Sequence, residues 1–125
     1  MAYNILIVDD SPTVRAVIKK TLNLASFNIG QIMEAANGQE ALNTIDEHDV
    51  DFILSDINMP VMSGVEFVDR LKERGELGST PVIVISTEGS TTRIEELKRK
   101  GVSAYVRKPF TPESISNIVN NVMGK

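Results

Sequence analysis

The sequence predicts an α/β fold, a doubly wound five-stranded parallel sheet flanked by five helices. Three observations predict it. Five short apolar runs alternate with five stretches of helical periodicity, three of those runs (residues 5–8, 52–54 and 82–85) are apolar at every position, and two runs end directly on aspartates. Strands that helices cover on both faces are apolar throughout. Alternating strands and helices form right-handed βαβ units, so the sheet should be parallel.

Composition limits the possible functions. The chain has 125 residues, 42% of them hydrophobic, a formal net charge of -4 and no cysteine. We therefore expect one domain over residues 1–125 with no output domain, and no disulfide framework, thiol catalysis or thiolate metal site. Its Lys and Arg residues are scattered, which disfavours nucleic acid as a partner. No signal peptide or membrane segment precedes the first apolar run, so we expect a cytoplasmic protein. We also expect a monomer.

The first half of the chain contains three expected strands and two helices. Residues 4–8 form a strand, after which Ser11 caps a helix whose first position is Pro12. The helix should pack one apolar stripe on the sheet, while Arg15, Lys19 and Lys20 point elsewhere. The stripe comprises Val14, Val17, Ile18, Thr21 and Leu22. Residues 31–35 read as a weaker strand, Asn37 caps a helix that runs to about residue 47, and residues 51–55 form the third strand.

The second half repeats the pattern. Ser63 or Gly64 opens a helix that ends near Gly75, and residues 82–85 form the most β-branched strand. A charged helix over residues 92–100 stops at Gly101, and residues 104–106 form a short strand. Thr111 and Pro112 start the last helix with the same cap and proline signature as the first. Apolar residues on these helices that should face inward are Val65, Phe67, Val68, Leu71, Ile115, Ile118, Val119 and Val122.

The strand order follows from the apolar runs. Continuously apolar strands belong at the centre of a sheet, and short or mixed ones belong at its edges. This predicts the order 2-1-3-4-5, whose switch point lies between strands 1 and 3. Asp9, Asp10 and Asp56 should converge there. At about 4 Å and an effective dielectric near 20, each pair of carboxylates repels by about 4 kcal/mol, so the cluster needs a cation.

The motifs at successive strand ends resemble those of the receiver domain of response regulators, most closely the single-domain chemotaxis regulators of the CheY type. The residues that carry the resemblance are Asp9-Asp10, Asp56 with Asn58-Met59-Pro60 and Gly64, Ser86, and Lys108-Pro109-Phe110. The strand order is itself known for CheY, so that expectation also draws on the resemblance.

The resemblance implies a Mg²⁺ site and a phosphoacceptor. Asp10 and Asp56 would ligate the ion directly, Asp9 would act through water, and the backbone carbonyl of Asn58 would complete the protein ligands. Asp56 would attack the phosphorus of a phosphohistidine on a partner kinase, with Lys108 as the fixed positive charge. An acid cluster that only caps the first helix is the alternative structural interpretation.

The same resemblance assigns switch and lifetime residues. The Ser86 hydroxyl would donate to the phosphoryl group, and Tyr105 would rotate into the space that Ser86 leaves, which changes the surface of the fourth helix, fifth strand and fifth helix for a downstream protein. Asn58 and Glu88 would tune the access of water to the phosphorylated Asp56. Thr87 stands where relatives usually have alanine or glycine, and its bulk is expected to restrict access to the site.

Other functions fit less well. A haloacid-dehalogenase-like phosphatase needs an acid at the position of Asn58, and an FMN carrier needs a phosphate loop in place of Asp9 and Asp10. His48, the only histidine, is expected at a helix end, so the chain is a poor candidate for a phosphohistidine kinase or a phosphotransfer domain. The expected function is a phosphoacceptor switch in chemotaxis, not an enzyme on a separate substrate. The alternative is a stand-alone phosphorelay or developmental receiver with a non-motor partner.

Overall fold

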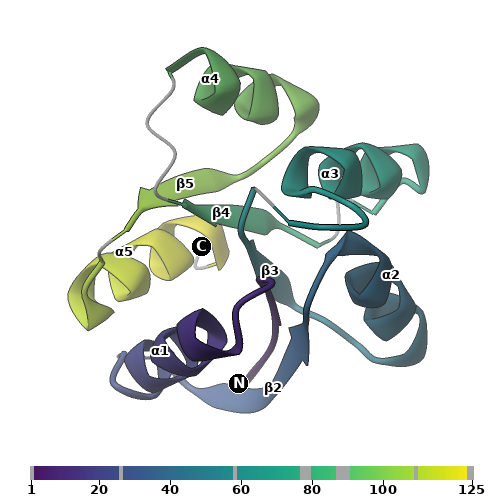
Figure 1. Ribbon diagram of the computed structural model, residues 1–125. Coiled ribbons are helices and arrows are strands. Elements are labelled where there is room, and N and C mark those ends of the chain that lie inside the picture. Colours follow the sequence, from purple (N-terminus) through teal and green to yellow (C-terminus); the bar gives the residue numbers. More distant parts are fainter. Residues whose placement is uncertain are drawn as a thin grey trace.

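The computed structural model describes residues 2–25, 27–57, 59–76, 80–86, 91–108 and 110–123 (Figure 1). Strands and helices alternate along this part of the chain. The strands are β1 (Tyr3–Val8), β2 (Ile29–Ala35), β3 (Phe52–Ser55), β4 (Val82–Ser86) and β5 (Ala104–Arg107). The helices are α1 (Pro12–Asn23), α2 (Gly38–Glu47), α3 (Gly64–Glu73), α4 (Thr91–Lys100) and α5 (Pro112–Met123).

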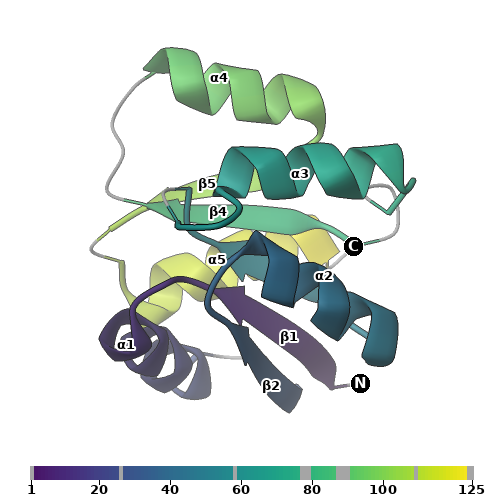
Figure 2. The same ribbon diagram turned by 45° about the vertical axis from the view of Figure 1, so that its right-hand side comes forward.

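All strand pairs are parallel, and the sheet has the order β2-β1-β3-β4-β5 (Figures 1 and 2). The predicted fold class and strand order are therefore confirmed. The three continuously apolar strands occupy the centre, where helices exclude water from both faces. The chain adds β2 on one side of β1 and then β3, β4 and β5 on the other side, so the switch point lies between β1 and β3. Open α/β sheets bind their ligands at this point.

The helices divide the core into two layers, one on each face of the sheet (Figures 1 and 2). Alternate residues of each strand point to opposite faces, so Ile5 and Ile7 pack with α1 and α5, while Leu6 and Val8 pack with α2, α3 and α4. The helical residues that pack on the α1 and α5 face include Ile18, Leu22, Ile115 and Val119. The helices of the other face contribute Ala41, Leu42, Phe67, Val68, Leu71 and Leu97.

The predicted helix caps are present. The Ser11 hydroxyl accepts the N–H of Val14 at 3.2 Å with Pro12 in the first helical position. The Asn37 side chain accepts the N–H of Glu40 at 2.9 Å. Ser63 and Glu66 form a reciprocal capping box at the start of α3. Each cap satisfies an N–H group that the helix itself leaves without a partner, so these helix starts are encoded locally.

The structure differs from the sequence prediction in a few places. Val17, expected on the inner stripe of α1, is 55% exposed, because Ile18 and Leu22 form the line of contact with the sheet and Val17 lies beside it. The weak second strand is longer than predicted and begins at Ile29, where the β1 to β2 register is irregular between Tyr3 and Ile5. Elsewhere the predicted boundaries hold within two residues. No helix in the described ranges is long and apolar enough to cross a membrane.

Candidate functional site

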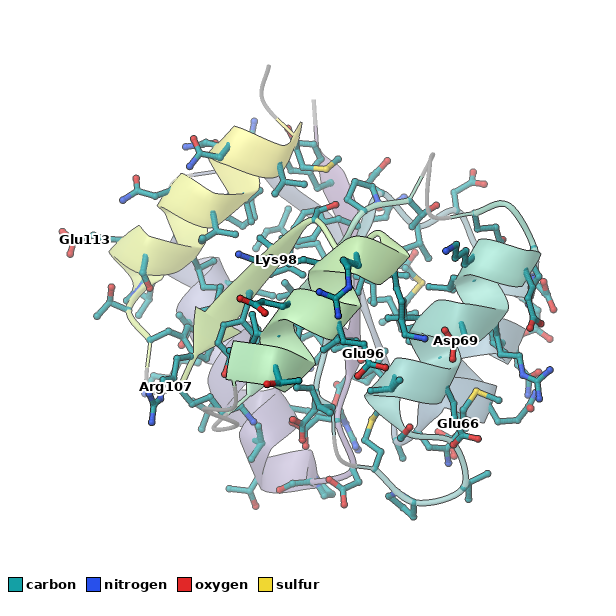
Figure 3. All side chains as sticks on the ribbon, turned by 90° about the horizontal axis from the view of Figure 1, so that it is seen from above. Glu66, Asp69, Glu96, Lys98, Arg107 and Glu113 are labelled. Atoms are coloured by element: carbon teal, nitrogen blue, oxygen red, sulfur yellow. The ribbon has the colours of Figure 1, made fainter. Side chains whose placement is uncertain are left out.

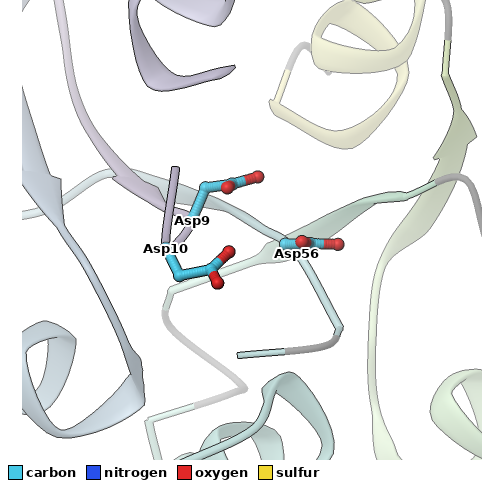
Figure 4. A group of neighbouring side chains, drawn as sticks. All are labelled: Asp9, Asp10 and Asp56. Atoms are coloured by element: carbon cyan, nitrogen blue, oxygen red, sulfur yellow. The ribbon is translucent and has the colours of Figure 1, made fainter. Parts of the chain in front are cut away.

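The carboxyl ends of β1 and β3 bring three acids together at one edge of the sheet. Val8 pairs with Ser55, and the N–H of Asp56 donates to the Val8 carbonyl at 2.9 Å. Asp9 and Asp56 therefore leave adjacent strands at the same level. Asp9, Asp10 and Asp56 each offer a carboxylate oxygen, and these oxygens lie within 4.8 Å of one another (Figure 4). The predicted convergence of the three acids is confirmed.

Asp9 is the buried member of this cluster, only 2% exposed. Its Oδ1 accepts the N–H of Ser11 at 2.9 Å, and its Oδ2 lies 3.3 Å from Nζ of Lys108, which follows β5. Both carboxylate oxygens thus have a positive or N–H partner. A buried carboxylate needs such partners, because burial without them is costly. Asp9 therefore lies at the buried inner end of the site and is held there by Ser11 and Lys108.

Asp56 and Asp10 form the outer part of the cluster. Asp56 is half-buried, and its Oδ1 accepts the N–H of Ile57 at 2.8 Å. Asp10 is exposed. Exposure therefore increases from Asp9 through Asp56 to Asp10, so the site opens to solvent on the side of Asp10 and Asp56. A ligand from solution would meet these two carboxylates first.

Gly64 lets the start of α3 approach the site. Its N–H donates to the Ile57 carbonyl at 2.6 Å, and a Cβ at this position would lie 2.2 Å from the Asp56 carbonyl oxygen. No side chain fits at that distance.

At the outer tip of the same loop, Val61 has a φ of +67° and is 81% exposed. Such a conformation is costly for a β-branched residue and persists only when the surrounding turn is held firmly.

Sequence reasoning missed two residues beside the cluster. It assigned Arg15 to the solvent side of α1, but the Arg15 side chain is only 16% exposed and contacts Glu34 and the Asp9 carbonyl. The hydrogen bond from Arg15, and to a smaller extent the one from Lys19, holds the pKa of the Glu34 carboxyl below its ordinary value. The pairing of Ile7 with Glu34 places this acid on β2 beside α1. The predicted adjacency of strands 1 and 2 was the signal in the sequence that could have placed Glu34 near Arg15.

The other predicted site residues are only partly described. Ser86 is the last residue of β4 and pairs with Arg107 of β5, but its side chain lies outside the described part. Asn58, Thr87 and Glu88 also lie outside the described residues. Tyr105 is half-buried on β5 and packs against the core layer of α2, α3 and α4. The roles assigned to these residues stay predictions.

The donor set of the cluster fits a hard divalent cation. It consists of carboxylate oxygens, the ligands that Mg²⁺ prefers, and opposite ligands of an octahedral Mg²⁺ lie about 4.2 Å apart. The observed spacing of up to 4.8 Å is close to that value. Three carboxylates against the single ammonium of Lys108 leave net negative charge in this described cluster. A divalent ion would offset the repulsion among them.

A parallel sheet of this order, with an acidic cluster and a lysine at its carboxyl edge, is the arrangement of a receiver domain. Residues 5–120 match the response regulator receiver domain, and the chain therefore belongs to that family. It is 34% identical over 121 residues to a chemotaxis protein CheY homolog of Campylobacter jejuni, which covers 96% of this chain and 92% of that protein.

Solved structures show the same likeness. Chemotaxis protein CheY4 of Vibrio cholerae has a TM-score of 0.85 and 34% identity, over 98% of this chain and 100% of that one. The CheX–CheY–BeF3–Mg complex of Borrelia burgdorferi contains a chain with a TM-score of 0.86 and 29% identity, over 98% of this chain and 90% of that one. The similarity therefore extends over nearly the whole chain.

Proposed function

We propose that this receiver accepts a phosphoryl group on Asp56 from a phosphohistidine of a sensor histidine kinase and then changes a protein-binding surface. The observation that carries the proposal is the cluster of Asp9, Asp10 and Asp56 within 4.8 Å, with Lys108 at 3.3 Å from Asp9. A nucleophilic carboxylate, further acids for a cation and a fixed ammonium are the groups that phosphoryl transfer requires.

The reaction is a simple displacement. A carboxylate oxygen of Asp56 attacks the phosphorus, the P–N bond breaks, and the imidazole of the kinase leaves with the electron pair. The Lys108 ammonium neutralises charge on the phosphoryl oxygens in a site where Asp9 holds it in place. Bound Mg²⁺ would supply the remaining neutralisation of these oxygens.

The ligand assignment follows the exposure of the acids. Asp10 and Asp56 line the open side and would ligate Mg²⁺ directly. Asp9 has both oxygens engaged by Ser11 and Lys108, which favours contact through water. The backbone carbonyl of Asn58 is proposed as a further ligand from the family resemblance. The Borrelia burgdorferi relative was solved as a complex with BeF3 and Mg.

Switching is proposed to start at Ser86. Donation from its hydroxyl to the phosphoryl group would be a charge-assisted bond worth about 1.5 to 3 kcal/mol. Moving a two-state equilibrium from 10:90 to 90:10 takes roughly 2.6 kcal/mol, which lies within the range of one such bond. Inward rotation of Tyr105 would follow and change the surface of α4, β5 and α5. Figure 3 looks onto this surface, with Lys98 on α4, Arg107 on β5 and Glu113 on α5.

The biological setting is proposed from the relatives. The Campylobacter jejuni and Vibrio cholerae relatives are chemotaxis proteins, which supports a chemotaxis regulator that acts in the cytoplasm. We propose that residues 1–125 act as a monomeric receiver through protein contacts, with neither nucleic acid nor membrane as a partner. Asn58 and Glu88 would set the lifetime of the phosphorylated state.

The proposal is tested with acetyl phosphate and Mg²⁺ as the phosphodonor system. Intact mass should show the gain of one phosphoryl group in the wild type, and none in Asp56→Asn or after removal of Mg²⁺ with a chelator. Asp49→Asn, which changes the same charge at an exposed position outside the cluster, is the matched control and should label normally. Labelling of Asp56→Asn to the wild-type extent would refute Asp56 as the acceptor.

A further inference from the structure

Arg15 joins the acid cluster to the edge of the sheet. Its Nη1 donates to the backbone carbonyl of Asp9 at 2.6 Å, and its Nε donates to Oε1 of Glu34 at 2.9 Å. The guanidinium therefore bridges α1, the end of β1 and β2. Its planar fork can make both bonds at once, which the single ammonium of a lysine cannot do in the same geometry.

Glu34 holds this guanidinium in place. It projects from β2 and accepts a second bond from Nζ of Lys19 at 3.2 Å. Lys19 thus shares the Glu34 carboxylate with Arg15 and makes this contact outside the acid cluster. The two basic residues differ in one respect that matters here, because only Arg15 touches the backbone of a cluster residue.

The Asp9 backbone is held on both sides. Its N–H donates to the Ala35 carbonyl at 3.0 Å, and its carbonyl accepts from Arg15. That carbonyl belongs to the peptide unit that leads into Asp10. The orientation of this peptide plane sets the direction in which the exposed Asp10 carboxylate leaves the chain, since the backbone on either side of a planar peptide moves with it.

From this geometry we infer that Arg15 is a positioning residue, which fixes the peptide between Asp9 and Asp10 and thereby holds the Asp10 carboxylate in place for a divalent cation. The inference rests on the proposed function, because it assumes that the cluster binds such a cation. Groups that orient metal ligands typically change metal affinity by about 10- to 100-fold when they are removed.

Electrostatics alone predicts the opposite sign. Arg15 is a positive charge beside a site for a dication, so removing that charge should strengthen cation binding. A positioning role predicts weaker binding when the guanidinium is removed, even though the repulsion falls. It also predicts weaker binding in Arg15→Lys, in which the charge is kept and the fork is lost. The sign of the change in affinity therefore separates the two roles.

The test is a Mn²⁺ titration of the full chain followed by electron paramagnetic resonance, with Mn²⁺ as the probe in place of Mg²⁺. The variants are Arg15→Gln, Arg15→Lys and the matched control Lys19→Gln. We expect both Arg15 variants to bind Mn²⁺ about tenfold or more weakly, and Lys19→Gln to stay within twofold of the wild type. The amide ¹⁵N resonance of Asp10 in the metal-free protein should shift in the Arg15 variants and not in the control.

Unchanged or tighter Mn²⁺ binding in folded Arg15→Gln would overturn the inference, and so would full affinity in Arg15→Lys. Thermal unfolding of each variant shows which proteins are folded at the titration temperature, and Arg15→Lys, the milder change, keeps the test valid if Arg15→Gln unfolds. Failure of the wild type to bind Mn²⁺ would instead overturn the cation site of the proposed function. Wild-type binding with unaltered variants would overturn only the role of Arg15.

Discussion

Gly64 offers the sharpest test of how the fold supports the site. In Gly64→Ala the new Cβ would lie 2.2 Å from the Asp56 carbonyl oxygen and 2.8 Å from the Ile57 Cα. Both contacts are with backbone, so no side chain can rotate away. To reach an ordinary contact of 3.4 Å, the start of α3 and the backbone at Asp56 must separate by about 1.2 Å.

We expect this displacement to lower both stability and reactivity. Overpacking of this kind typically costs about 1 to 3 kcal/mol of the free energy of unfolding. Alanine has a better helix propensity than glycine, by up to about 1 kcal/mol. The net loss of stability is the overpacking cost less this gain. Displacement of a reacting group by about 1 Å can cost about 100-fold in rate, and the backbone that moves carries the proposed acceptor Asp56.

Gly38→Ala is the matched control. Gly38 also occupies the first position of a helix, but a Cβ there would meet Cγ and Sδ of Met62 at 2.7 and 2.8 Å, and the next nearest atom, Cβ of Phe67, lies at 3.0 Å and needs to give by only a few tenths of an ångström. The two closest atoms belong to the flexible Met62 side chain, which can move away. Urea unfolding and the rate of labelling by acetyl phosphate should therefore change much less in Gly38→Ala than in Gly64→Ala. Wild-type stability and rate in Gly64→Ala would refute the reasoning.

Three further predictions concern the neighbourhood of the site. Lys108→Met leaves the buried Asp9 carboxylate without its ammonium partner, which should lower the free energy of unfolding by about 1 to 3 kcal/mol. Adding Asp9→Asn to the Lys108→Met chain should recover part of the lost stability. Strictly additive effects of the two substitutions in urea unfolding would contradict this coupling. Arg15 lowers the pKa of Glu34 from its ordinary value of 4.5. The stability that this ion pair contributes is therefore present above pH 4.5 and is lost as the pH falls through the lowered pKa. The difference in unfolding free energy between the wild type and Glu34→Gln should vanish in acid. Thr87→Ala should label faster with acetyl phosphate, and an equal rate in quenched-flow assays would discard the steric role of Thr87.

Much of the site was predictable because it depends on strand ends. Asp9 and Asp56 each follow a continuously apolar run, and two parallel central strands must end at the same edge of a sheet. The caps at Ser11, Asn37 and Ser63 were predictable for a similar reason, since each acts within four residues of chain.

Contacts between elements were less predictable. Helical periodicity identifies an apolar face of α1 but not its line of closest contact, so Val17 was assigned to the core although it is exposed. The same limit applies to Arg15, which the pattern placed in solvent. Its partners come from β1 and β2, and their positions depend on the register of two strands and the rotation of a helix above them.

The amino-acid sequence alone determined the class of fold and the meeting of three carboxylates at one edge, because apolar runs, caps and strand ends are local properties that a parallel sheet combines in only a few ways. For the strand order, the apolar runs were joined by the family resemblance. The resemblance already implied Lys108 as the positive charge opposite the acids. Tertiary structure decided how the acids are held: which of them Lys108 faces, the contact of Arg15 with the Asp9 carbonyl, and the close approach of Gly64 to Asp56. These contacts join residues that are far apart along the chain or on different elements. They follow from the packed distances between elements, which periodicity and composition do not contain.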